Sequence, residues 1–139
     1  MLCTTPIACQ RLSDGKRRSH TSRVFGIHFP LLIEPFIHAV AESLSPEYED
    51  GDWTFYRLSN GAFYMAPLSD KYFPVVGLNG HEDILSADAL GITACLYAYS
   101  HLSFLDNQAL AETCAEHYHL LRDYMLEQTE AEGILGAID

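Results

Sequence analysis

Residues 52–67 constrain the fold more than any other part of this sequence. They read DWTFYRLSNGAFYMAP, two aromatic segments on either side of an Asn60-Gly61 pair. Asn and Gly tolerate positive φ, so this pair between two apolar runs is the strongest short-range signal of a β-hairpin. We therefore predict strands near 52–58 and 62–66.

Aromatic residues lie on both faces of the predicted hairpin. Within their strands Phe55 and Phe63 share one parity, and Tyr56 and Tyr64 share the other. We expect the first face to pack against helices. The Tyr56/Tyr64 face is expected to be partly covered or available to a partner, either as a homodimer contact or by packing under the amino-terminal residues.

Hydrophobic periodicity predicts three helices and one further strand. The helices are expected over 31–44, 87–102 and 108–128, and apolar residues surround most of the second one, as in a central buried helix. A short strand near 73–78 would complete a small antiparallel sheet with the hairpin 52–66. The predicted fold class is α+β, with about three strands and three to four α-helices.

Local signals refine the two longer helices. Ser86 is a predicted amino-terminal cap, and Asp106 or Asn107 fills that role for the last long helix. Gly91 inside a helix costs about 1 kcal/mol relative to Ala, which favours close packing against a neighbouring element.

Length and composition indicate one globular domain. The chain has 139 residues, of which 48% are hydrophobic and 19% charged. Apolar runs fall short of the roughly 20 residues of a membrane helix, and the first nine residues lack the basic and apolar regions of a secretory signal. We expect a cytoplasmic protein without membrane contact.

Charge divides the chain into two parts. Five of the eight basic residues lie within 1–23, which we interpret as a basic, flexible arm before a single domain over 24–139. The cluster Lys16-Arg17-Arg18 suits a solvated tail, and contact with nucleic acid or membrane is the alternative. From Val24 onward, the chain has 18 acidic residues and only three basic ones. Such a body disfavours strong direct binding to DNA, and its charge serves either solubility or contact with a basic partner.

Part of this acidity follows the predicted helix over 108–128. At about 100° per residue, five acidic side chains fall on one stripe away from the apolar face. They are Glu112, Glu116, Asp123, Glu127 and Glu130. As candidate partner-binding residues we take Glu112, Glu116, Asp123, Glu127 and the terminal Asp139.

Groups for catalysis or metal binding do not converge in the sequence. His117 and His119 point about 200° apart on a helix, and the Glu34/His38/Glu42 row is typical of surface charge pairing. Cys95 and Cys114 fall in apolar helical stretches, where thiols are buried and unreactive. We therefore predict no catalytic, metal or cofactor-binding residues, with one alternative: the turn His81-Glu82-Asp83 as an acid/base or metal site.

Three separated blocks resemble the ArdB/KlcA family of antirestriction proteins. The hairpin resembles its W-x-F-Y-x-L-S-N-G-x-F-Y-M-A-P block, residues 85–92 its L-S-A-D-A-x-G-I block, and the terminus its A-I-D ending. The resemblance runs from about Val24 to Asp139, and the basic, cysteine-containing first 23 residues depart from it.

This resemblance implies a non-catalytic protein that inhibits type I restriction endonucleases and protects incoming plasmid or phage DNA, with a compact α+β fold and no cofactor. The implied partner is the type I restriction-modification complex or an associated host DNA-processing protein, engaged directly or indirectly. Two alternatives remain at this point: an acidic interaction module or partial DNA mimic that regulates a DNA-processing enzyme, and a small enzyme that uses the turn at His81, Glu82 and Asp83.

Overall fold

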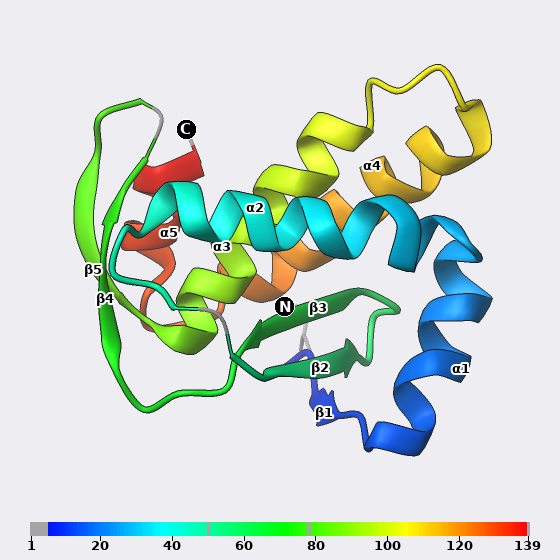
Figure 1. Ribbon diagram of the computed structural model, residues 1–139, viewed down its shortest axis with the longest axis horizontal. Helices are drawn as coiled ribbons and strands as arrows, with labels where there is room; N and C mark the ends of the chain where they lie inside the picture. Colours follow the sequence, from blue (N-terminus) through cyan, green and yellow to red (C-terminus); the bar gives the residue numbers. More distant parts are fainter. Residues whose placement is uncertain (1–5, 50, 78, 139) are drawn as a thin grey trace, which may run out of the picture.

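Helix α3 (Ala87–Leu102) forms the centre of the molecule, and the other elements pack around it (Figure 1). The computed structural model describes residues 6–49, 51–77 and 79–138. Twelve of the 16 residues of α3 are buried, which confirms the predicted central helix. Before and after it in the chain come β1 (Cys9–Arg11), α1 (Asp14–Phe25), the π-helical turn η1 (Phe29–Ile33), α2 (Glu34–Leu44), β2 (Trp53–Leu58), β3 (Phe63–Pro67), β4 (Tyr72–Val76), β5 (Glu82–Ser86), α4 (Gln108–Met125) and α5 (Ala131–Ile138).

Strands β2 and β3 form the predicted hairpin. They pair antiparallel, with Trp53 opposite Pro67 and Tyr56 opposite Tyr64. Gly61 adopts a φ of 97°, and among the described residues positive φ is confined to glycines, so Asn60 does not share it. Instead, Asn60 Nδ2 donates a 2.8 Å hydrogen bond to the Leu120 carbonyl of α4. The turn thus anchors the hairpin to a helix.

Helix α3 packs closely on β3 at Gly91. A Cβ atom there would lie 2.4 Å from the Ala66 Cα atom and 2.5 Å from the Met65 carbonyl oxygen. This confirms that close packing explains the glycine. The predicted cap is also confirmed, because the Ser86 side chain accepts a hydrogen bond from the Ala89 backbone N–H. For α4 the cap is Asn107, which accepts from Leu110.

The strand predicted near 73–78 forms, but its placement in the hairpin sheet is wrong. Strand β4 pairs antiparallel with β5, with Pro74 opposite Ile84, in a second sheet of two strands. Residues 82–86 were not predicted as a strand because Glu82 and Asp83 precede the apolar pair and hide the alternation. Ser45 Oγ donates to the Pro74 carbonyl at 2.7 Å and ties β4 to the end of α2. The α+β class itself is confirmed.

The loosely packed arm predicted over residues 1–23 is wrong for the part from Cys9 onward. Strand β1 pairs with β2, with Cys9 opposite Leu58, so the first sheet has the order β1-β2-β3. Helix α1 follows and buries His20, Thr21 and Phe25. A strand held by backbone hydrogen bonds and a helix with few apolar residues leave little periodicity to detect. Cys3 lies outside the described residues.

Aromatic rings fill the space between α1, the hairpin and α3. The Phe63 ring contacts the rings of Phe25, Phe29 and Phe55 with centroids 5.5 to 6.0 Å apart. The Tyr99 ring of α3 stacks on Phe25 at 6.1 Å. This face of the hairpin packs against helices, as the alternation predicts.

In the ranges that the structure describes, no single helix is long and apolar enough to cross a membrane. Two consecutive helical segments, Asp14–Phe25 and Phe29–Leu44, would together be long and apolar enough by length and composition alone, but they are bent by 95° relative to each other.

Candidate functional site

The acidic stripe of α4 lies on the surface. Glu112, Glu116, Asp123 and Glu127 are all exposed, as predicted. Glu112, Glu116 and Asp123 recur at four- and seven-residue steps and share one side of α4, and Glu127 follows in the turn after Met125, where the helix ends. Asp139, the fifth candidate, lies outside the described residues. The structure therefore gives a solvent-facing row of four carboxylates, which we call the acidic face.

Two carboxylates of the acidic face, and Glu130 next to it, accept hydrogen bonds within the chain. Glu127 Oε1 accepts a 3.1 Å hydrogen bond from the Ile7 backbone N–H, and Glu112 Oε1 accepts a 3.0 Å bond from Gln108 Nε2. Glu130 accepts two bonds from Ser86, from the backbone N–H at 2.9 Å and from the hydroxyl at 2.5 Å. Glu130 thus belongs to the contact between the α4–α5 connection and the start of α3, apart from the acidic face.

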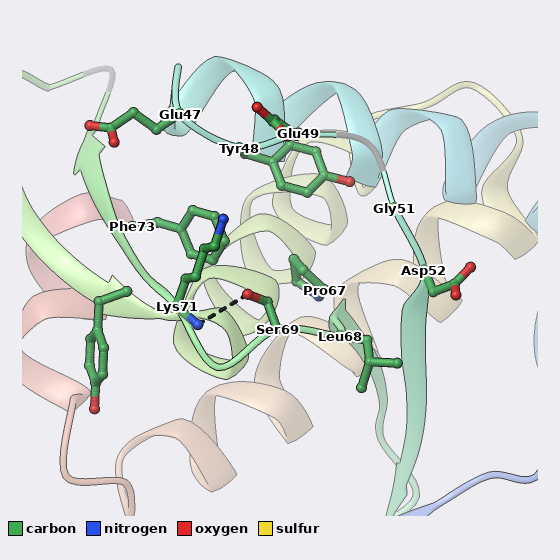
Figure 2. Close-up of a pocket in the computed structure, with 11 residues that line it drawn as sticks. Glu47, Tyr48, Glu49, Gly51, Asp52, Pro67, Leu68, Ser69, Lys71 and Phe73 are labelled. Carbon is green, nitrogen blue, oxygen red and sulfur yellow. Dashed lines mark hydrogen bonds between the residues drawn. The ribbon is translucent and has the colours of Figure 1, made fainter.

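A second acidic region borders a pocket of about 460 Å³ between the α2–β2 loop and the β3–β4 connection (Figure 2). Glu47, Glu49 and Asp52 line it, together with aromatic residues. Lys71 supplies the positive charge, and its backbone N–H donates a 3.0 Å bond to Ser69 Oγ. In the sequence, Glu47, Glu49 and Asp52 form only an acidic segment, because the wall of the pocket from β4 comes from a distant part of the chain.

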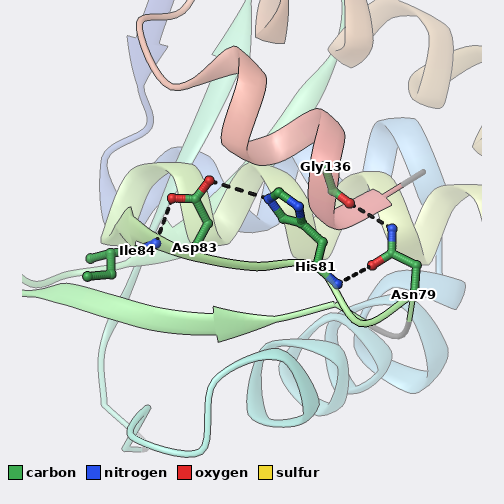
Figure 3. Close-up of polar contacts among 5 residues, drawn as sticks. All are labelled: Asn79, His81, Asp83, Ile84 and Gly136. Atoms are coloured by element: carbon green, nitrogen blue, oxygen red, sulfur yellow. Dashed lines mark hydrogen bonds and ion pairs between the residues drawn. The ribbon is translucent and has the colours of Figure 1, made fainter.

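The turn before β5 holds the carboxy-terminal helix in place (Figure 3). His81 Nε2 lies 3.4 Å from Asp83 Oδ2, and the His81 backbone N–H donates to Asn79 Oδ1 at 3.0 Å. Asn79 Nδ2 in turn donates a 2.7 Å bond to the Gly136 carbonyl of α5. A Cβ atom on Gly136 would lie 2.4 Å from His81 Nε2, so a larger residue there would require this ring to move.

The third member of that turn, Glu82, is exposed and lies opposite Val76 in the β4–β5 pair. It does not share the contacts of His81 and Asp83. The geometry of this turn therefore has an architectural explanation: it docks α5 onto the second sheet.

The Tyr56/Tyr64 face is covered at Tyr64, where the Tyr124 ring of α4 lies 5.9 Å away between centroids and the edge strand β1 contributes Cys9. The Tyr64 ring is 1% exposed and stacks on Tyr56 with centroids 4.8 Å apart. Cys9 of β1 places its sulfur 3.8 Å from the Tyr64 hydroxyl oxygen. That hydroxyl donates a 2.7 Å hydrogen bond to Asp88 Oδ1 at the start of α3. Burial raises the pKa of Tyr64 far above its usual value, and the Asp88 charge raises it further, so the phenol stays protonated.

Buried imidazole and thiol groups belong to the core. His117 is 4% exposed, its Nδ1 atom accepts from the Phe63 backbone N–H at 3.2 Å, and burial lowers its pKa to about 4. Burial raises the pKa of Cys95 to about 12 and that of Cys114 to about 11. These groups are neutral at pH 7, as expected of core residues.

His38 and His119 lie on different helices, α2 and α4. His119 is exposed, and the His38 ring packs on Trp53 with centroids 4.6 Å apart. Among the described residues, no group of three or more His, Cys, Asp or Glu side chains is placed to hold a metal ion.

Comparison with known proteins gives consistent matches along the chain. Residues 46–139 match the protein family described as antirestriction protein. The antirestriction protein KlcA of Escherichia coli is 36% identical over 139 residues, which cover 97% of this chain and 95% of the relative. The uncharacterized protein YafX of E. coli K12 is 39% identical over 144 residues, which cover 99% of this chain and 88% of YafX.

A solved structure extends this similarity to the whole fold. It superposes with a TM-score of 0.89 at 31% sequence identity and covers 100% of this chain and 99% of the solved one. It comes from work on the KlcA and ArdB proteins, which describes a novel fold and antirestriction activity against type I DNA restriction systems in vivo but not in vitro.

Proposed function

The chain belongs to the antirestriction protein family, and from this premise we propose that it counteracts type I restriction in the cell and protects incoming plasmid or phage DNA. The observation that carries the proposal is the structural match over the full chain, to a solved member of the KlcA and ArdB group with this activity in vivo. The first sheet, the central helix and the carboxy-terminal helix all lie within the matched region.

We propose that inhibition is indirect. The matched protein acts against type I systems in vivo but not in vitro, which favours a requirement for another cellular component. The partner is then a DNA-processing protein associated with restriction, or the restriction complex in a state that exists only in the cell. The acidic face offers such a partner a rigid row of carboxylates on a helix packed against α3.

The acidic face is too sparse to imitate a DNA duplex. From Glu112 to Asp123 the helix rises about 16 Å, a length over which duplex DNA carries about 10 phosphates. Over that length the acidic face offers three carboxylates, and the fourth, Glu127, lies beyond the end of α4 and accepts a hydrogen bond from Ile7. A local contact with a basic protein patch fits this charge density better than full DNA mimicry.

We further propose that the protein acts in the cytoplasm and without catalysis. His81 and Asp83 lie against Gly136 and Gly133 of α5, and this packing accounts for the one turn that suggested acid/base chemistry. The variants His81→Gln, Glu82→Gln and Asp83→Asn keep side-chain size and remove that chemistry. Antirestriction should survive in all three, whereas its loss in a variant that keeps the wild-type melting temperature would favour an enzyme.

A plating assay tests the main proposal. Expression of the protein in a host with an active type I system should raise the plating efficiency of unmodified phage towards that on a non-restricting host. Modified phage on the same host controls for general effects on infection. An unchanged plating efficiency at normal expression of folded protein would contradict the proposed function.

The role of the acidic face has its own test. The triple variant Glu112→Gln, Glu116→Gln, Asp123→Asn should lose antirestriction and keep its fold, because all three side chains are exposed. The matched control neutralises three exposed carboxylates on other elements, in Glu42→Gln, Glu82→Gln, Glu132→Gln. If both triples behave alike, the acidic face has no particular role.

A further inference from the structure

Helix α1 carries a concentration of positive charge on an otherwise acidic molecule. Lys16, Arg18 and Arg23 are exposed on it. Arg57 of β2 lies close to them. Burial lowers the pKa of His20 in α1, and the nearby charges of Arg23 and Arg57 lower this pKa further. Arg23 Nη2 lies 3.1 Å from His20 Nδ1. We call the exposed side of α1 with these cations the basic face.

Small residues separate the cations of the basic face. At about 100° per residue, Lys16 and Arg23 lie on one side of the helix and Arg18 lies about 140° from Arg23. The exposed residues between them are Gly15, Ser19 and Ser22. A polyanion can therefore approach the helix backbone closely while cations reach it from both sides.

The basic face is held rigidly on the body of the protein. Arg17 Nη2 donates a 2.7 Å hydrogen bond to the Trp53 carbonyl, and its guanidinium lies 4.6 Å from the centroid of the Phe55 ring. Thr21 and Phe25 are buried beneath the helix. The cations of α1 are thus preorganised, unlike those of a mobile tail, and lose less conformational entropy on binding.

Two acidic side chains lie near the basic face. Asp14 pairs with Arg17 at 3.5 Å between Oδ1 and Nε, and Glu34 lines the groove that Arg18 also lines. The β4–β5 sheet and α5 lie at the opposite end of the molecule from α1 (Figure 1). At physiological ionic strength the Debye length is about 8 Å, so the carboxylates at that end weaken the local positive potential only slightly. Helix α4, which carries the acidic face, contacts α1, so its carboxylates reduce that potential more.

We propose that the basic face binds the phosphate backbone of duplex DNA without reading its sequence. Phosphates are recognised by Arg, Lys and Ser side chains of the kinds gathered here. The centre of the face holds Gly and Ser, whereas the core of a protein–protein interface is apolar or aromatic. Single-stranded nucleic acid needs exposed aromatic rings for stacking, and the exposed positions of α1 hold none. This inference is independent of the proposed antirestriction activity.

The size of the face sets the strength of binding. Lys16 and Arg23 are about 10 Å apart along the helix, which matches roughly three phosphates of one DNA strand. Neutralising three phosphates gives a slope of log K against log salt of about −3, with a Kd in the non-specific range of about 10⁻⁴ to 10⁻⁶ M.

Fluorescence anisotropy with a labelled duplex of mixed sequence tests the proposal. The purified full-length protein should bind at low salt and lose affinity with the predicted slope as KCl rises. The triple variant Lys16→Gln, Arg18→Gln, Arg23→Gln should bind about tenfold or more weakly, with a slope of about −1 from the remaining Arg57. The matched control removes cations from the acidic body, in Lys71→Gln with Arg122→Gln, and should bind like the wild type.

A second variant keeps every cation. Ser22→Glu places a negative charge in the middle of the basic face and should also weaken binding, at an unchanged melting temperature. Absence of wild-type binding at low salt, or equal binding by the triple variant, would overturn the inference. Displacement of the duplex by polyglutamate at equal charge concentration would also overturn the inference, because the face would then bind any acidic polymer.

Discussion

The hydroxyl of Tyr64 donates a 2.7 Å hydrogen bond to the carboxylate of Asp88, and this bond joins the hairpin to the start of the central helix. Burial raises the pKa of Asp88, the bond from Tyr64 lowers it, and the charge of Glu130 raises it again. The bond therefore favours the ionised carboxylate in a partly desolvated place.

We expect Tyr64→Phe to lower the free energy of unfolding by about 2 kcal/mol at pH 7, because the carboxylate loses a charge-assisted bond. Without that bond the pKa of Asp88 rises further. A carboxyl with a raised pKa binds more protons when folded, so stability falls as pH rises through the window between its unfolded and folded pKa values. In urea denaturation, Tyr64→Phe should therefore lower the free energy of unfolding more at pH 7 than at pH 4. In an Asp88→Asn background, the effect of Tyr64→Phe should not depend on pH. If the effect still depends on pH in that background, this explanation is wrong.

Acid should destabilise the protein through His117. Its pKa is lowered to about 4 by burial and, to a lesser extent, by the charge of His20, so the unfolded state binds more protons below about pH 6.5. The free energy of unfolding should fall by up to about 3 kcal/mol as pH drops from 6.5 to 4. His117→Gln should flatten this part of the profile in denaturant titrations. Exposed His119 gives the control: if His119→Gln flattens the profile equally, the assignment to His117 is wrong.

Gly91→Ala should destabilise the fold severely. The added Cβ would meet backbone atoms of Ala66 and Met65, which cannot rotate away. Overpacking of this kind costs about 1–3 kcal/mol. Gly15→Ala is the matched control, since nothing lies within 4 Å of a Cβ atom there and Ala favours the helix. Thermal unfolding should show a lower midpoint for the first variant and an equal or higher one for the second.

Thiol labelling should separate the cysteines by burial. Cys9 is exposed, whereas Cys95 and Cys114 are buried with pKa values raised to about 12 and about 11 by burial. In a Cys3→Ala background, a thiol reagent at pH 7.5 should label one group in the native protein and all three in denaturant. Fast native labelling of Cys95 or Cys114 would mean that α3 or α4 opens readily.

The sequence was most informative where one segment carries a complete local signal. The Asn60-Gly61 pair, the Ser86 cap and the apolar circumference of residues 87–102 each depend on neighbours in the chain, and each is confirmed. The exposure of the α4 carboxylates follows from helical periodicity alone. Their role in partner binding stays a prediction.

The features that sequence reasoning missed depend on contacts between distant segments. Strand β1 has three residues, and only its pairing with β2 makes it a strand. The acidic pocket takes its walls from the segments around Glu49 and Phe73, and the anchor of Asn60 is a carbonyl 60 positions away. The cluster Lys16-Arg17-Arg18 is interpreted from the sequence as a solvated tail, with contact to nucleic acid or membrane as the alternative, because the pattern of residues 14–25 does not reveal the helix that orders these charges.

The three-residue strand β1 lies at the edge of the first sheet and covers the open side of β2. An uncovered β2 would present unpaired backbone N–H and C=O groups to any chain that meets it, a template for strand addition. Proteolytic removal of the residues before Leu12 should therefore turn a well-behaved protein into one that self-associates through its sheets.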